Sequence, residues 1–223
     1  MLNAGLFFAA GLGTRMAPLT DNRPKPLIEV GGTTLLDHAL DLGDAAGIAP
    51  QVVNIHYLPD MIATHVAHRP VRLSDERDAL LETGGGLRKA RPLLGPGPVF
   101  TMNTDAVWDG PNPFDMLRAG WDGGRMEALL LCVPLERALG HPGRGDFTFA
   151  ADGRIDYGPG PIYTGAQIID PAVLDEIDDD AFSMRLAWDR LIARGTCYGL
   201  TYAGRWCDVG RPECLDLAES LLR

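Results

Sequence analysis

AGLFFAAGLGTR, residues 4–15, is the stretch of sequence that decides the fold class. Its apolar first half, residues 4–9, predicts a short buried strand. Two glycines and Arg15 follow at once, and in an open α/β sheet ligands bind beyond the carboxyl ends of the strands. Glycines there let backbone N–H groups approach an anion without a Cβ in the way, and an arginine adds a charge-assisted contact. The stretch therefore predicts an anion-binding loop at the edge of a sheet.

Other phosphate-binding motifs fit this loop less well. The Walker pattern needs Gly-Lys followed by Ser or Thr, and no lysine lies near Gly13. A dinucleotide fingerprint needs a third glycine where Met16 stands, and a Pro-rich stretch replaces the helix that should follow. A Gly-x-Gly pair on its own also fits a plain tight turn. The pair by itself therefore leaves both interpretations open.

The rest of the chain alternates strand-like and helix-like segments, which predicts a Rossmann-like three-layer α/β/α fold with a mixed, mostly parallel sheet. Strands are expected at 51–55, 71–73, 98–103 and 127–133, and helices at 35–46, 59–68, 83–91 and 113–119. After residue 135, Gly and Pro cluster between short β-like pieces at 147–150 and 163–169. From these pieces we expect antiparallel strands that form a lid over the sheet. A helix at 183–193, a strand at 197–202 and a helix from Pro212 complete the pattern.

The composition argues against several classes of function. The 223 residues carry a formal net charge of -10, which speaks against a general nucleic-acid-binding face. This charge does not exclude a nucleotide substrate, which needs only a few local cations and metal ions. The sequence contains neither an apolar run of membrane-spanning length nor a secretory signal pattern. Four cysteines without C-x-x-C spacing indicate neither a zinc site nor disulfides, and we expect a cytoplasmic protein.

The longer string GLGTRMAPLT (11–20), followed by PKPL (24–27), resembles the signature of the nucleotidyltransferases that make NDP-sugars. The resemblance implies a loop that wraps the triphosphate, an arginine that holds the departing pyrophosphate, and a lysine that bridges the α-phosphate and a sugar phosphate. These roles fall to Gly11, Leu12, Gly13, Thr14, Arg15 and Lys25. The prolines on either side of Lys25 also restrict the backbone from which its ammonium projects. The alternative interpretation is an ordinary exposed Pro-Lys-Pro loop.

Two aspartates are the candidate metal ligands. Nucleotidyl transfer needs a divalent metal to neutralise charge at the α-phosphate, and Mg²⁺ favours a few carboxylates together with phosphate oxygens. Asp105 closely follows the expected strand 98–103, and Asp208 follows Trp206-Cys207. The resembling family carries Asn-Gly-Asp and Trp-x-Asp-x-Gly at these places, which implies that both aspartates hold Mg²⁺. Thr104 stands where the family has glycine and would narrow the approach of the backbone to the nucleotide. The alternatives are a helix cap or turn for Asp105 and a turn for Asp208.

LETGGG (81–86) is the element expected to recognise the base. In the resembling family this segment contacts the nucleobase, which implies binding by Thr83 and Gly84, with Asn103 also on the nucleotide. A helix that begins in glycines offers free N–H donors for base carbonyls. The segment 54–57 is a further candidate for the wall of the base pocket. The alternative is a glycine-rich helix start with no ligand.

GRGDF (143–147) is the element expected to select the acceptor, because it resembles uridylyltransferases that act on N-acetylmuramate 1-phosphate. The resemblance implies that Asp146 binds a sugar hydroxyl, that Gly145 lets the ring approach, and that Thr164 and Gly165 flank the sugar or its phosphate, beside Lys25. The alternative is a loop capped by an aspartate.

The sequence therefore predicts Mg²⁺-dependent transfer of a nucleotidyl group, by preference uridylyl, from an NTP to a sugar 1-phosphate, by preference N-acetylmuramate 1-phosphate. We expect one domain over 1–223, with a nucleotide-binding half at 1–133 and a small sugar-binding lobe with the C-terminal part at 134–223. The expected partners are these small molecules, with neither nucleic acid nor membrane. One alternative is cytidylyl, guanylyl or thymidylyl transfer to phosphocholine, mannose 1-phosphate or glucose 1-phosphate. Others are a catalytically silent nucleotide-binding module and, least favoured, a dehydrogenase.

Overall fold

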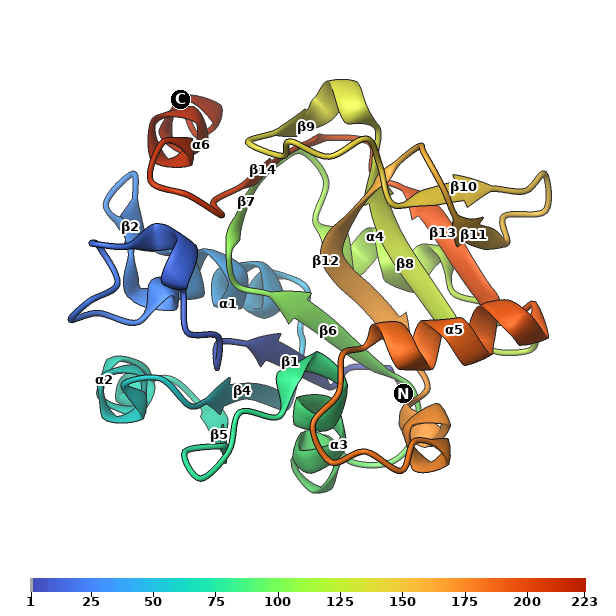
Figure 1. Ribbon diagram of the computed structural model, residues 1–223, viewed down its shortest axis with the longest axis horizontal. Helices are drawn as coiled ribbons and strands as arrows, with labels where there is room; N and C mark the ends of the chain where they lie inside the picture. Colours follow the sequence, from blue (N-terminus) through green and yellow to red (C-terminus); the bar gives the residue numbers. More distant parts are fainter. Residues whose placement is uncertain (1) are drawn as a thin grey trace.

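A seven-stranded sheet forms the centre of the computed structural model, which describes residues 2–223 (Figure 1). In spatial order its strands are β13 (Cys197–Thr201), β8 (Ala128–Val133), β12 (Ile162–Ile169), β6 (Val99–Asn103), β1 (Gly5–Phe8), β4 (Gln51–Ile55) and β5 (Val71–Asp75). β12 runs antiparallel to β6 and β8, whereas the other neighbouring strands pair in parallel. The expected mixed, mostly parallel sheet is confirmed.

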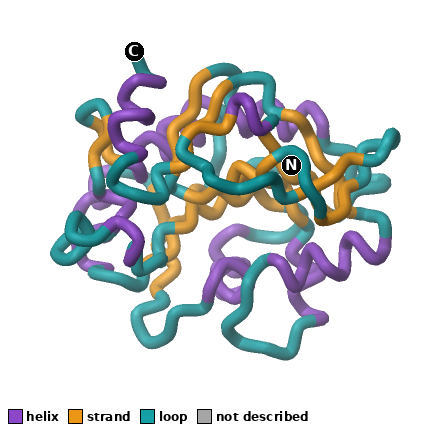
Figure 2. The backbone as a smooth tube through the Cα atoms, turned by 45° about the horizontal axis from the view of Figure 1, so that its top comes forward, coloured by secondary structure: helices purple, strands orange, loops and turns teal. Residues whose placement is uncertain are grey.

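Helices cover both faces of this sheet, and the strands run between the two helical layers (Figures 1 and 2). One layer holds α1 (Leu35–Ala45), α2 (Pro59–His65) and α4 (Pro113–Gly120), and the other holds α3 (Glu82–Leu94) and α5 (Arg185–Arg194). Successive side chains of a strand point to opposite faces. In β1, Phe7 joins the core beneath α1 and α4, and Leu6 joins the core beneath α3. Burial of each such side chain contributes about 2 kcal/mol, so the apolar run of β1 stabilises both layers.

A smaller three-stranded sheet joins segments that lie far apart in the sequence. It consists of β7 (Ala106–Asp109), β14 (Arg205–Asp208) and β9 (Ala138–Leu139), and α6 (Cys214–Leu221) packs against it. Two hairpins complete the strands, β2 (Glu29–Val30) with β3 (Thr33–Thr34) and β10 (Phe147–Phe149) with β11 (Ile155–Tyr157). Short 3-10 turns cover Thr14–Met16, Lys25–Leu27, Val66–His68, Leu135–Arg137 and Pro171–Glu176. The sequence pattern predicts no strand at β7 or β14, because four residues carry too little periodicity to be recognised.

Two sequence-based expectations about the fold are wrong. The strand expected at 163–169 as part of a lid is β12, which lies inside the main sheet and is buried on both faces from residue 164 to 169. Its continuous apolar character is that of a strand covered on both sides rather than of a lid. The helix expected to end before Pro92 runs on to Leu94. A proline in the last turn costs only one backbone hydrogen bond, so the helix continues past it for two residues.

None of the helices within residues 2–223 combines the length and the apolar composition that crossing a bilayer requires.

Candidate active site

A cavity of about 500 Å³ opens where β1, β4 and β6 end. This volume lies in the range of small-molecule binding sites, and the carboxyl ends of parallel strands are where α/β sheets bind their ligands. Its lining residues are Phe8, Ala9, Ala10, Gly11, Leu12, Gly13, Thr14, Arg15, Met16, Lys25, Pro26, Asn54, Leu80, Glu82, Thr83, Asn103, Thr104, Asp105, Ser183 and Gly210. The structure therefore brings together four separate segments that the sequence singled out, at 11–15, Lys25, Thr83 and 103–105.

The glycine-rich loop folds back on the segment that carries Lys25. Gly13 adopts the left-handed conformation with φ 66°, and a Cβ there would lie 2.9 Å from the Cβ of Lys25. The Thr20 hydroxyl donates to the Gly13 carbonyl at 3.0 Å. Met16 is fully buried and anchors the short 3-10 turn that follows. Only glycine combines this backbone angle with so close an approach, so Gly13 sets the shape of the loop.

Lys25 projects from a buried turn. Pro24, Lys25 and Pro26 are all buried, so the alternative of an exposed Pro-Lys-Pro loop is wrong. The side chain of Lys25 is 11% exposed, and its Nζ lies 2.8 Å from Oδ2 of Asp105. A buried ammonium is costly unless it is paired, so the ion pair with Asp105 stabilises the Lys25 side chain at the cavity wall.

Asp105 and Asp208 are brought together by the small sheet. β7 begins one residue after Asp105, and its first residue, Ala106, pairs with Asp208 in β14. The Val209 N–H also donates to the Asp105 carbonyl at 2.9 Å. Burial raises the pKa of Asp208, and the charge of Asp105 raises it further, while nearby cations lower it. The two neighbouring carboxylates repel each other, and a bound cation would offset this repulsion.

This pair of carboxylates fits a magnesium ion. Mg²⁺ in phosphate-transferring sites takes one or two carboxylates and completes its shell with water and substrate phosphates. Within residues 2–223, no group of three or more His, Cys, Asp or Glu residues has the geometry of a metal site, so a closed all-protein site is not built there. His141 lies beside Asp208, with Nδ1 3.8 Å from Oδ2. Two carboxylates are the number of protein oxygen ligands that Mg²⁺ takes where substrate phosphates supply the rest.

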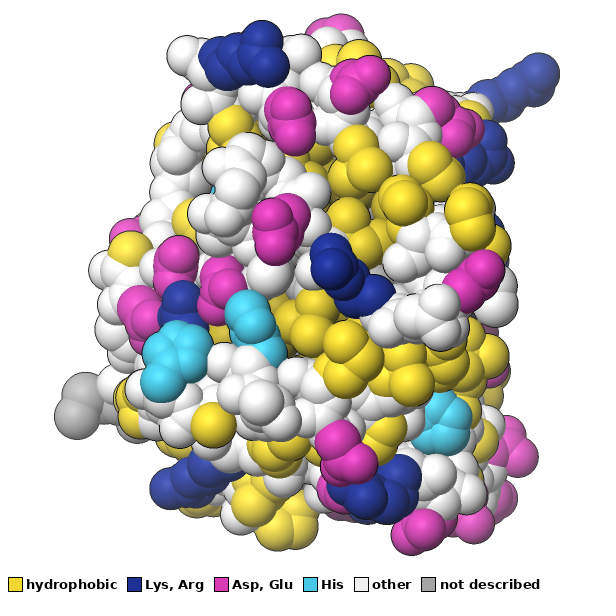
Figure 3. All heavy atoms as spheres, turned by 90° about the vertical axis from the view of Figure 1, so that its left-hand side faces the viewer, with side chains coloured by type: hydrophobic (Ala, Val, Ile, Leu, Met, Phe, Trp, Pro, Cys, Tyr) yellow, Lys and Arg dark blue, Asp and Glu magenta, His cyan; other side chains and the backbone are white. Residues whose placement is uncertain are grey.

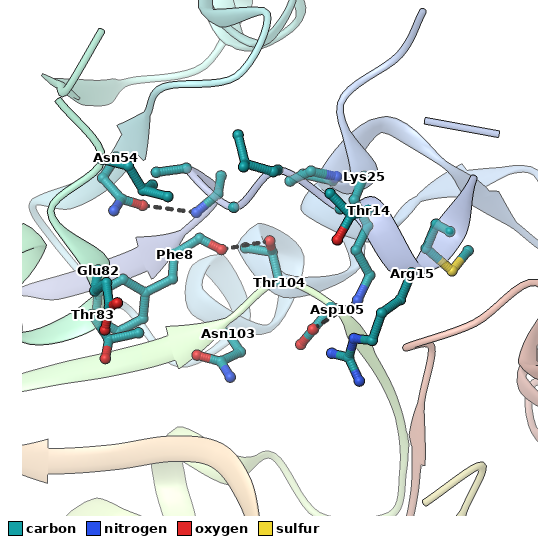
Figure 4. A pocket seen from close by; sticks show the side chains of 18 of the residues that line it. Phe8, Thr14, Arg15, Lys25, Asn54, Glu82, Thr83, Asn103, Thr104 and Asp105 are labelled. Atoms are coloured by element: carbon teal, nitrogen blue, oxygen red, sulfur yellow. Dashed lines mark hydrogen bonds and ion pairs between the residues drawn. The ribbon is translucent and has the colours of Figure 1, made fainter. Parts of the chain in front are cut away.

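The cavity is polarised along its length (Figure 4). Lys25, Arg15 and Asp105 lie at one end, and Glu82 and Thr83 lie at the other. The end with Lys25 and Arg15 suits phosphates, because both cationic side chains of the lining lie there. On the outer face formed around α2, the glycine-rich loop and α6, by contrast, acidic, basic and apolar side chains are interspersed (Figure 3).

At the other end of the cavity, α3 begins with a strained residue. Glu82 has φ 58°, an unusual value for a residue other than glycine. The hydroxyl of Thr83 accepts a hydrogen bond from the Met184 N–H at 2.8 Å. The N–H groups of Gly84 and Gly85 both donate to the Phe182 carbonyl, at 2.8 and 3.2 Å. The expectation that these glycines offer free N–H donors is therefore wrong, and Gly84, unlike Thr83, is not part of the cavity lining.

The glycines of this segment have a packing role instead. A Cβ at Gly84 would lie 2.3 Å from the Phe182 ring, and one at Gly85 would lie 2.4 Å from the Asp180 carbonyl. Both glycines let the segment before α5 pass close to α3, and this segment supplies Ser183 to the cavity wall.

The four residues expected at the sugar lie outside the cavity lining. Asp146 Oδ2 accepts from the Tyr163 N–H at 2.9 Å, and the Thr164 hydroxyl donates to the Leu131 carbonyl at 2.7 Å. Gly145 has φ 106°, and a Cβ there would lie 2.0 Å from the Gly160 carbonyl. Gly165 has φ 86° and lies against the side chain of Asn103, which does line the cavity. In this structure these residues stabilise the positions of β10 and β12. Of the four, only Gly165 contacts a residue of the cavity lining, Asn103.

Thr104, which stands in place of the usual glycine, is accommodated without closing the cavity. It is 2% exposed, and its hydroxyl donates to the Phe8 carbonyl at 2.8 Å. The side chain of Thr104 therefore ties the end of β6 to the end of β1, while the residue still forms part of the cavity lining. Sequence reasoning missed several other lining residues, among them Leu80, Glu82 and Ser183. In the sequence, only their position beside a motif could have indicated that these residues line the cavity. Asn54, by contrast, was recognisable as a polar residue at the end of a strand.

Comparisons with known proteins give the family of the chain. Residues 5–143 match the MobA-like NTP transferase domain. The chain is 38% identical to the N-acetylmuramate alpha-1-phosphate uridylyltransferase of Caulobacter vibrioides, over 97% of this chain and 96% of that protein. It is 29% identical to the mannose-1-phosphate guanyltransferase of Yarrowia lipolytica, over 94% of this chain but 61% of that longer protein.

Solved structures share the fold at low sequence identity. HddC from Yersinia pseudotuberculosis complexed with GMP-PN has a TM-score of 0.80 at 19% identity, with 100% of both chains covered. A putative glucose-1-phosphate thymidylyltransferase from Bacillus anthracis has a TM-score of 0.82 at 18% identity, over 99% of this chain and 95% of that chain. The family match covers more than half of the chain and the curated relative nearly all of it, and on these grounds the chain belongs to the MobA-like NTP transferase family.

Proposed function

We propose that this protein transfers a uridylyl group from UTP to N-acetylmuramate 1-phosphate and releases pyrophosphate. The observation that carries the proposal is the convergence of the glycine-rich loop, Lys25 and Asp105 at one end of a nucleotide-sized cavity. The choice of base and sugar is supported by the 38% identity to a uridylyltransferase of that specificity over nearly the full length of both chains.

The reaction needs positioning and charge stabilisation rather than a nucleophile from the protein. A phosphate oxygen of the sugar 1-phosphate attacks the α-phosphorus of UTP, and the bond from the α-phosphorus to the bridging oxygen of the pyrophosphate breaks in line with it. Lys25 stabilises the charge that gathers between the two phosphates, and Arg15 holds the departing pyrophosphate. Gly11, Leu12, Gly13 and Thr14 present the loop to the triphosphate. Preorganised cations in a water-poor site are the main source of such rate enhancement.

Asp105 and Asp208 would hold the Mg²⁺ ion of this reaction. The ion supplies Lewis-acid neutralisation of the phosphate charge when it is bound. The protein contributes the paired carboxylates and the small sheet that keeps them adjacent. The pKa of Asp208, raised by burial and by Asp105, is consistent with a site that gains from a bound cation.

The remaining residues divide between the base and the acceptor. Thr83 and Asn103 are proposed at the nucleotide, while Gly84 packs against Phe182, within a nucleotide-binding half at 1–133 that supplies all but two of the lining residues, Ser183 and Gly210. The part at 134–223 is the proposed sugar-binding lobe. There Gly145, Asp146, Thr164 and Gly165 are the residues proposed for the acceptor, and Gly165 packs against Asn103. We place the reaction in the cytoplasm, where nucleoside triphosphates are made, which cell fractionation would test.

A second candidate function is guanylyl transfer to mannose 1-phosphate. The observation that favours it is the similarity to mannose-1-phosphate guanyltransferases, although the chain spans only 61% of the length of those relatives. Pyrophosphate release should be measured with each of the four NTPs against N-acetylmuramate, N-acetylglucosamine, glucose and mannose 1-phosphates. Turnover with UTP and N-acetylmuramate 1-phosphate is expected to be greatest. An inert UTP would overturn the assignment, and binding without turnover for every pair would indicate a silent module.

A further inference from the structure

A buried carboxyl group lies directly behind the nucleotide cavity. Glu76 follows β5, is 0% exposed, and its N–H donates to the Ile55 carbonyl at the end of β4 at 2.8 Å. Its Oε1 accepts from the Asn54 Nδ2 at 2.8 Å. Burial raises the pKa of Glu76, the Asn54 amide and the Leu81 N–H lower it, and its Oε2 is otherwise buried without a close hydrogen-bond partner among residues 2–223. Keeping such a group in the core is costly, and the roles proposed for the cavity residues do not use it.

Asn54 links Glu76 to the backbone at the start of the glycine-rich loop. Asn54 is 2% exposed and lines the cavity, and its Oδ1 accepts from the Ala9 N–H at 2.7 Å. An amide side chain is an acceptor at one end and a donor at the other. Because Glu76 accepts from the Asn54 Nδ2, the Oδ1 of Asn54 is held toward the Ala9 N–H. At Ala9 the chain leaves β1 and enters the loop.

The same carboxyl group reaches the start of α3. A Cβ at Gly86 would lie 2.9 Å from Oε1 of Glu76 and 3.1 Å from Nδ2 of Asn54. The third glycine of LETGGG therefore provides the space in which the Glu76–Asn54 pair sits. The first turn of this helix carries Thr83, at the opposite end of the cavity from Lys25.

We propose that Glu76 is a positioning residue for nucleotide binding. It orients Asn54, Asn54 holds the backbone that leads into the phosphate loop, and the pair packs into α3 at Gly86, so the two ends of the cavity are set by one buried hydrogen-bond chain. The inference rests on the proposed function only in that the cavity takes a nucleoside triphosphate.

The test exchanges the donor and the acceptor of the pair. Asn54→Asp keeps an acceptor for the Ala9 N–H but sets a second carboxyl group against Glu76. Adding Glu76→Gln restores a donor–acceptor pair with its direction reversed, because the glutamine amide can donate to the new aspartate. Affinity for UTP with Mg²⁺ is measured by calorimetry without acceptor, and KM is measured separately for UTP and for the sugar phosphate.

Asn54→Asp is expected to weaken UTP binding about tenfold, and the double variant to recover to within about threefold of wild type, as for the loss and return of one hydrogen bond with an ionised group. KM for UTP should move with the Kd, while KM for the sugar phosphate stays nearly constant. Gln167→Met is the matched control, because it breaks a buried pair with Thr101 in the same sheet but outside the cavity. Its UTP affinity should equal that of wild type.

The possible outcomes separate the two proposals. If wild-type protein does not bind UTP or any other NTP, the proposed function fails. If it binds and the double variant binds no better than Asn54→Asp, the positioning role of Glu76 is wrong. Equal changes in KM for UTP and for the sugar phosphate in Asn54→Asp would also contradict the proposal, because they would indicate a general structural role for Glu76. Should Asn54→Asp not fold, Glu76→Met is measured instead, and unchanged UTP affinity in that variant overturns the proposal.

Discussion

Lys25 Nζ lies 2.8 Å from Asp105 Oδ2, across a sequence separation of 80 residues. The lysine comes from a buried 3-10 turn and the aspartate from the end of β6. The same carboxylate is a proposed ligand of the metal ion. One aspartate therefore serves two cations, and the free protein keeps its lysine paired at the place where the phosphates are proposed to bind. Removing either partner leaves the other charge poorly compensated. Because only Asp105 is also a proposed metal ligand, we expect substitution of Lys25 to lower kcat and substitution of Asp105 to change the Mg²⁺ dependence.

Lys25→Met is expected to lower kcat/KM about 100- to 1,000-fold, as does the loss of other groups that stabilise transition-state charge. Most of the loss should lie in kcat, since the lysine acts on charge that develops during transfer. Steady-state kinetics with saturating Mg²⁺ measures it. Lys89→Met is the control, because Lys89 is the only other lysine of the chain and is exposed on α3. A kcat within threefold of wild type in Lys25→Met would contradict the assigned role.

Asp105→Asn and Asp208→Asn should each raise the Mg²⁺ concentration for half-maximal activity at least tenfold, because a neutral amide is a poorer ligand for a hard cation. A Mg²⁺ titration of initial rates measures the shift. Asp109→Asn, at the other end of β7 and paired with Arg205 on the surface, is the matched control. Unchanged Mg²⁺ dependence in both active-site variants would remove these residues from the metal site.

Thr104→Val should lower the free energy of unfolding by about 1–2 kcal/mol, because it leaves the Phe8 carbonyl without its side-chain donor while the volume is preserved. Thr104→Gly should cost more, since it also removes buried atoms and adds backbone freedom. Urea unfolding measures both. The activity of the folded Thr104→Val protein is expected to stay near wild type, because the hydroxyl is already used by the Phe8 carbonyl. A large fall in kcat at unchanged stability would show that Thr104 contacts the nucleotide.

The pH dependence of stability reports on Glu76. Its folded-state pKa lies above the ordinary 4.5 because of burial, although hydrogen bonds from Asn54 and the Leu81 N–H, together with Lys89 and His56, act in the opposite direction. The native protein therefore takes up a proton at a higher pH than the unfolded chain does. The stability of wild type relative to Glu76→Gln should rise as pH falls through the folded pKa and level off below 4.5. Chemical unfolding of both proteins at several pH values measures the difference, and a difference independent of pH would mean that the pKa is not raised.

The sequence alone determined the class of fold and the parts of the site that are local in the chain. The apolar run of β1, the glycine loop behind it and the alternation of later segments follow from patterns within a few residues of each other. Lys25, Asp105 and Thr83 were recognisable because each sits in a short motif with a physical role.

Only the tertiary structure decided which of these parts meet. The pairing of Asp208 with Ala106 brings a second carboxylate beside Asp105, and it depends on two short strands almost 100 residues apart. The antiparallel insertion of β12, the use of the Gly84 N–H by Phe182, and the Glu76–Asn54 chain likewise depend on long-range packing. Local sequence sets backbone preference and burial, but hydrogen-bond partners across the sheet are chosen by the packing of the whole chain. For that reason the glycine-rich loop at 11–15 was visible in the sequence, while the buried carboxyl group behind it was not.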